Sequence, residues 1–154
     1  MTGANMKVND SAVATLRAML VGDMDAYERL LDSLKTEEEQ GGFFTLVTAA
    51  FFEAVDQKFA PPNNVAELPD IIEFIAYQRS AYPTVADQLD PNVAEQVIMH
   101  AIGKGTISDD VGGDALLGTK LLLLAALSND ADLDEARLDN FLTKARAEAD
   151  EHLH

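Results

Sequence analysis

Apolar residues recur along most of the chain at intervals of three and four positions, the spacing of one face of an α-helix. No stretch alternates apolar and polar residues as a half-buried strand does, and no Asn-Gly or Asp-Gly turn joins two strand-like runs. The pattern therefore predicts an all-α protein of about seven helices joined by short polar turns. The predicted helices cover residues 11–20, 23–34, 43–59, 71–82, 90–105, 115–127 and 133–153.

Polar residues, prolines and glycines mark several helix ends. Asp90 followed by Pro91 has the form of an N-cap and a first helical residue. Asp25 and Glu28 have capping-box spacing, with aspartate in place of serine or threonine. Pro83 is expected to close the helix before it, since proline cannot continue one.

Two of the predicted helices are apolar enough to lie at the centre of the fold. In residues 43–59, phenylalanine and valine side chains cover more than half of the helix circumference. Residues 115–127 form the most apolar stretch, with Lys120 in the middle of its leucine face and Gly118 opposite, where it would permit a close helix contact. Because a bilayer span needs about 20 apolar residues, we expect a buried helix here and no membrane association.

The length of the chain suggests one domain. It has 154 residues, of which 47% are apolar, enough to bury a core without disulfides or metal. We expect a single irregular or orthogonal helical bundle over residues 1–154, with flexible ends at 1–9 and 151–154.

The composition bears on partners and location. A formal charge of −16 repels phosphates, which disfavours nucleic acid and anionic membranes and leaves a basic protein as a suitable partner. The chain has no cysteine, so it offers neither disulfides nor a thiolate nucleophile. The first ten residues, "MTGANMKVND", lack the apolar core of a signal peptide. These features together predict a cytoplasmic protein.

Four residues are candidates for binding a ligand. Lys120, His100, Phe51 and Tyr77 would line a pocket between the helix of residues 43–59 and the helix that carries Lys120. A desolvated lysine there could anchor the carboxylate of a small metabolite. The alternative, which we favour, is structural: Lys120 reaches solvent or a carboxylate, His100 stabilises a helix end, and the phenylalanines form core or a dimer interface.

No metal or cofactor site is expected. The stretch "NDADLDE" places Asp130, Asp132 and Asp134 at the first, third and fifth positions of a calcium-binding loop. Glu135 and Phe141 stand where such a loop needs glycine and glutamate, so we interpret the acids, including the pair Asp132 and Glu135, as helix caps. The sequence also lacks a phosphate-binding loop, a dinucleotide fingerprint and a Gly-x-Ser-x-Gly motif.

Most of the chain from the first helix onward resembles a family of small all-helical actinobacterial proteins. The stretches that carry the resemblance include "LVTAAFFEAVDQKF", "IIEFIAYQRSAY" and "DPNVAEQVIMHAI". The family has no assigned activity, so the resemblance implies an intracellular bacterial setting and no functional residues.

Two functions remain after these exclusions. The first is a non-enzymatic interaction or regulatory module with an acidic surface, which would bind a basic protein or a second copy of itself as a homodimer. The second is a small-molecule binder or enzyme that uses the pocket described above. We favour the first, and expect no enzymatic activity, because no nucleophile, metal cluster or phosphate loop stands out.

Overall fold

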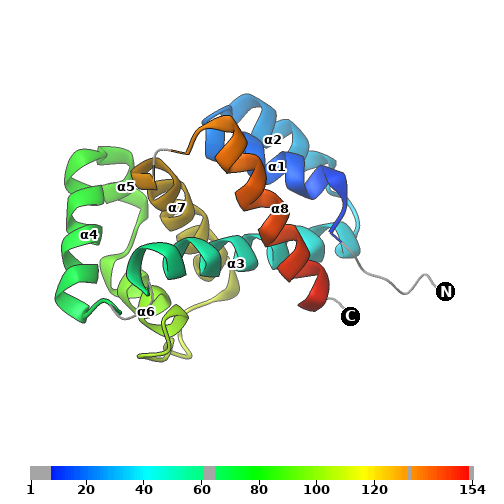
Figure 1. Ribbon diagram of the computed structural model, residues 1–154. Helices are drawn as coiled ribbons and strands as arrows, with labels where there is room; N and C mark the ends of the chain where they lie inside the picture. The colour runs from blue at the N-terminus through cyan, green and yellow to red at the C-terminus, as the bar shows by residue number, and fades with distance from the viewer. Residues whose placement is uncertain (1–7, 61–64, 132, 153–154) are drawn as a thin grey trace. The chain divides into compact units, whose positions relative to one another are not determined.

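The computed structural model describes residues 8–60, 65–131 and 133–152. Within these ranges the chain forms eight helices and no strand, which confirms the all-α prediction (Figure 1). The helices are α1 (Asp10–Val21), α2 (Met24–Ser33), α3 (Glu37–Phe59), α4 (Leu68–Ala81), α5 (Pro83–Gln88), α6 (Pro91–Ala101), α7 (Gly113–Ala131) and α8 (Glu135–His152).

The short helix α5 is the element that the sequence analysis did not predict. Pro83 was expected only to end the preceding helix, but it is the first residue of α5. Proline fits that position because an N–H in the first turn would have no acceptor within the helix, so its loss costs nothing. The φ angle of proline is also already helical. The predicted Asp90 cap before α6 is confirmed: its carboxylate accepts from Asn92 N at 2.9 Å.

The helices divide between two compact units. Unit 1 contains the described residues up to Ala50 and those from Ala131 onward, and unit 2 contains those from Phe51 to Asp130. The helix α3 contributes residues to both units. The single-domain expectation stays a prediction.

Capping residues set where the helices of unit 1 begin. Asn9 caps α1 by accepting from Ala12 N at 2.8 Å. The cap of α2 is Asp23, two residues earlier than predicted, with its carboxylate 3.1 Å from Ala26 N. Thr36 and Glu39 form a capping box that starts α3 six residues before the predicted Phe43. The glutamates preceding the phenylalanines therefore lie inside the first turn of α3.

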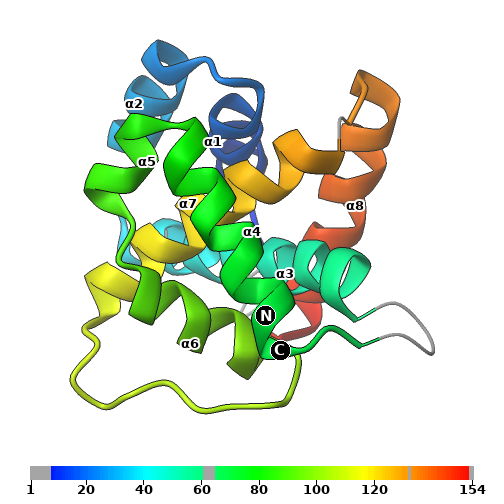
Figure 2. The same cartoon turned by 90° about the vertical axis from the view of Figure 1, so that its left-hand side faces the viewer.

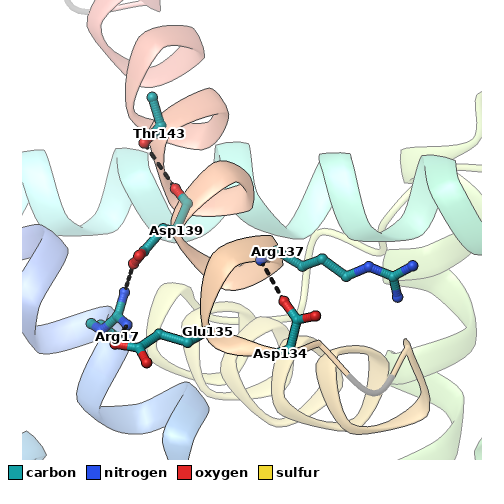
Figure 3. Close-up of polar contacts among 6 residues, drawn as sticks. All are labelled: Arg17, Asp134, Glu135, Arg137, Asp139 and Thr143. Atoms are coloured by element: carbon teal, nitrogen blue, oxygen red, sulfur yellow. Dashed lines mark hydrogen bonds and ion pairs between the residues drawn. The ribbon is translucent and has the colours of Figure 1, made fainter.

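Helix α8 begins with a cap and is tied to α1 by ion pairs (Figure 3). The carboxylate of Asp134 accepts from Arg137 N at 2.8 Å, whereas the predicted cap Asp132 lies outside the described residues. Arg17 on α1 pairs with Asp139 and lies 3.7 Å from a carboxylate oxygen of Glu135. These contacts accompany the packing of α1 against α8 within unit 1.

The segment before α1 is held against α8. Val8 is buried, and its N–H donates to Asp150 Oδ1 at 2.8 Å. Arg146 donates through Nη2 to the Val8 carbonyl and through Nη1 to Asp10 Oδ1, both at 2.8 Å. Val8 belongs to the end that the sequence analysis expected to be flexible; residues 1–7, 153 and 154 lie outside the described part.

Unit 2 has an apolar core to which α3, α4, α6 and α7 all contribute. Figure 2 shows α4 and α6, which pack against each other, and the long turn from α6 to α7. Among the described residues, the buried cluster includes Phe51, Val55, Phe59, Ile71, Phe74, Ile75, Leu89, Val97, Ile98, Leu123 and Leu127.

The leucine-rich helix α7 contributes buried side chains as predicted, among them Leu123 and Leu124. The expected close helix contact at Gly118 is wrong: a Cβ at this position would meet no atom within 4 Å, so no neighbour uses the missing side chain. None of the helices in the described ranges is both long and apolar enough to cross a membrane.

Candidate functional site

Unit 2 contains a pocket of about 560 Å³ that is open to solvent, here called the α4 pocket. Its walls come from the end of α3, from Ala66 in the segment that precedes α4, and from α4 itself. The side chains that line it are Lys58, Phe59, Asp70, Glu73, Phe74 and Tyr77.

The helical repeat brings the α4 residues of the pocket together. Glu73, Phe74 and Tyr77 lie three, four and seven positions after Asp70, so the four residues share one face of the helix. Opposite them, the Phe59 carbonyl at the end of α3 accepts from the Ala66 N–H at 2.6 Å. This hydrogen bond holds the segment before α4 against the end of α3.

Two phenylalanine rings form the base of the pocket. Phe59 and Phe74 pack edge to face, with centroids 5.3 Å apart and ring planes at 81°, and both side chains are buried. The Lys58 ammonium lies 5.7 Å from the Phe59 centroid and 5.2 Å from the Phe74 centroid. At these distances the ring quadrupoles attract a cation. The two rings at the base of the pocket can therefore attract a cation.

Carboxylates and an exposed tyrosine form the rim. Asp70 uses Oδ2 to accept from Glu67 N at 3.0 Å, a first-turn contact that fixes where its carboxylate lies. Glu73 is exposed one turn further along α4, and Tyr77 is 63% exposed. The rim thus offers two negative charges and an aromatic ring beside the Lys58 ammonium.

A second lysine supports the rim from outside the pocket. Lys104, in the turn after α6, donates from Nζ to the Ala66 carbonyl at 2.9 Å and lies 3.2 Å from Glu67 Oε1. The Lys104 ammonium therefore interacts with Glu67, which is not among the side chains that line the pocket. The segment that leads into α4 is held from two sides.

The four predicted site residues do not meet at this pocket. Tyr77 lines it, but Phe51 is 1% exposed inside the core of unit 2. His100 is exposed near the end of α6, and Lys120 is partly buried in α7; neither lines the α4 pocket. The proposal that Lys120 and His100 line a ligand pocket stays a prediction.

The sequence analysis missed Lys58, Asp70 and Glu73. A signal for them was present, because two acids and two aromatic residues recur at helical spacing from Asp70 to Tyr77. Only the apolar face of this segment was used to predict its role. The contribution of Lys58 had no such signal, since it depends on how the end of α3 meets α4.

Burial lowers the pKa of Lys120 below its ordinary value. In the folded protein, burial makes the charged form of Lys120 less favourable than it is in water. In the unfolded chain the lysine has its ordinary pKa of about 10.4. Between the two values the unfolded state binds more protons, so this group makes the wild type more stable as the pH rises.

We expect this dependence to disappear in Lys120→Met. Urea unfolding of both proteins from about pH 7 up to the ordinary pKa of lysine, about 10.4, should show wild type gaining stability relative to the variant as pH rises. Tyr27, whose pKa burial raises, is present in both proteins and cancels from the difference. A difference that stays constant with pH, or changes in the opposite direction, would contradict the assignment of a desolvated lysine.

The described residues contain no group of three or more His, Asp or Glu side chains that could hold a metal ion. The stretch interpreted as helix caps agrees with this at Asp134, whose carboxylate is engaged by the first turn of α8. Asp132 lies outside the described residues, so its part in that interpretation stays a prediction.

The chain matches no protein-family model, no curated protein and no solved structure. The resemblance to small actinobacterial helical proteins consequently stays an expectation. The chemistry of the α4 pocket and the charge of the chain are the grounds on which a function can be proposed.

Proposed function

We propose that the protein is a non-enzymatic interaction module that binds a basic partner protein through the α4 pocket. The observation that carries the proposal is the combination of a cation-attracting ring pair, Phe59 and Phe74, with the carboxylates of Asp70 and Glu73. Aromatic faces and carboxylates both bind lysine and arginine side chains.

The charge of the whole chain supports the same partner. With 27 acidic and 11 basic residues, the protein attracts a positively charged segment over long range and repels an acidic one. Such attraction accelerates encounter and selects partners, while the local contacts of a pocket determine where the segment stays. We place this interaction in the cytoplasm, to which a chain without cysteine is suited.

The proposal is tested with the peptide acetyl-Gly-Arg-Gly-Arg-Gly-amide in calorimetric titrations. Replacing both rim carboxylates, in Asp70→Asn/Glu73→Gln, should weaken binding about 2- to 30-fold, because each exposed ion pair contributes about 0.2–1 kcal/mol. The asparagine retains an oxygen that can accept the hydrogen bond from Glu67 N, so α4 keeps its cap.

The matched control is Asp25→Asn/Glu28→Gln on α2. It removes the same charge at the same spacing, from two exposed positions outside the pocket. We expect this variant to bind the peptide within about twofold of wild type. Equal weakening by the two double variants would mean attraction by overall charge alone, and would contradict a binding site on α4.

The homodimer and the small-molecule binder of the sequence analysis stay predictions. The volume of the α4 pocket lies within the range of ligand sites, about 300–1,000 Å³. Its open form and charged rim favour a side chain presented by another protein over an enclosed metabolite.

A further inference from the structure

We infer that Lys58 competes with the partner for one position. In the free protein its ammonium lies over the rings of Phe59 and Phe74, and in the complex a guanidinium or ammonium group of the partner replaces it. This inference rests on the proposed function and adds the chemistry of the ligand and the state of the empty site. It follows from the position of Lys58 over both rings.

The ring pair is a site for one cation. The two rings are held edge to face in the core of unit 2, so their geometry does not depend on a ligand. One ammonium lies 5.2 and 5.7 Å from the two centroids, within the distance of about 6 Å at which the attraction operates. A second cation cannot take the same position while Lys58 remains there, because like charges at contact repel.

The Lys58 side chain can move away from the two rings. It is an exposed residue, next to last in α3, and its four-carbon stem has many rotamers. At an exposed position the attraction between an ammonium and a ring changes an equilibrium only a few-fold. An ammonium that moves into water is hydrated again, which offsets part of the attraction to the rings that it loses.

A partner arginine has two advantages over Lys58 at the same position. Its planar guanidinium stacks on aromatic faces and pairs with carboxylates through parallel hydrogen bonds. Asp70 and Glu73 lie on the same face of α4 as Phe74 and can accept such bonds. An incoming guanidinium can therefore use the rings and the rim together.

The test compares the affinity of the peptide acetyl-Gly-Arg-Gly-Arg-Gly-amide for Lys58→Met, Lys58→Arg and wild type. Methionine keeps an unbranched apolar stem and removes the competing charge, so we expect binding about two- to fivefold tighter than wild type. Arginine keeps a cation over the rings, so Lys58→Arg should bind no tighter than wild type.

Removing a positive charge also makes the protein more acidic, which the control Lys35→Met measures. Lys35 is exposed and precedes α3, outside the pocket. Its replacement should tighten binding less than Lys58→Met does. If the two methionine variants bind equally, or if Lys58→Met binds more weakly than wild type, Lys58 is not a competitor and the inference fails.

A direct readout follows the lysine itself. Ring currents should shift the ε-methylene protons of Lys58 upfield in the free protein, and saturating peptide should remove this shift. An upfield shift that persists in the complex would overturn the inference. The two proposals fail separately: if the rim double variant weakens binding but Lys58→Met does not tighten it, the proposed function stands alone. If no variant changes the binding of the peptide, both are wrong.

Discussion

Replacing Phe51 with alanine is expected to lower the free energy of unfolding by about 3–5 kcal/mol. Phe51 is 1% exposed and belongs to the core cluster of unit 2, so its removal leaves a cavity that the surrounding side chains fill only in part. Small domains are typically stable by about 5–15 kcal/mol, so the loss is a large fraction of the total. Urea denaturation followed by circular dichroism measures the loss.

Phe44→Ala is the matched control on the same helix. Phe44 is 38% exposed, so its truncation removes less buried surface and should destabilise the protein much less than the loss of Phe51. The comparison also decides between two interpretations of Phe51. A loss below about 1 kcal/mol would contradict its place in a packed core and would favour the ligand pocket suggested by the sequence.

Replacing Arg146 with methionine is expected to lower the free energy of unfolding by about 1–3 kcal/mol. The methionine keeps the apolar stem but removes two hydrogen bonds, one to the Val8 carbonyl and one to the Asp10 carboxylate. Because Val8 is buried, its carbonyl would be left without this donor, and a buried polar group that loses its partner is costly.

The control for Arg146 is Arg137→Met, near the start of α8. Arg137 is exposed, and its guanidinium points away from the ion pairs of Arg17 in Figure 3. We expect a change below about 0.5 kcal/mol, as for other surface positions. Thermal unfolding of both variants measures the difference. Equal effects would mean that the hydrogen bonds at Val8 contribute nothing beyond the general effect of charge.

Much of the fold could be predicted from local signals in the sequence. The carboxylate of Asp90 caps the helix that Pro91 begins, and Gly22 ends α1 with a φ of 83°. Both act on residues next to them in the sequence, so they can be recognised without tertiary structure. Two caps were predicted wrongly or not at all: Asp25 was predicted for α2, where Asp23 is the cap, and the Thr36–Glu39 box before α3 was not predicted.

The candidate site was less predictable because it depends on contacts between distant segments. Tyr77 was predicted to line a different pocket, between residues 43–59 and the helix that carries Lys120, and the acids that share its helical face were not considered. The hydrogen bond from Lys104 to the Ala66 carbonyl joins positions 38 residues apart, and the one from Arg146 to Val8 joins positions 138 apart. No periodicity within one helix encodes such pairs.

The central claim, that the α4 pocket binds the cationic side chains of a basic partner, is tested most directly by titrating the arginine peptide into ¹⁵N-labelled protein. We predict that the shifted amide resonances cluster at residues 58–60 and 65–78, and that those of α2 stay unchanged although it too is acidic. Shifts spread evenly over all acidic helices, or confined to residues outside unit 2, would contradict the claim.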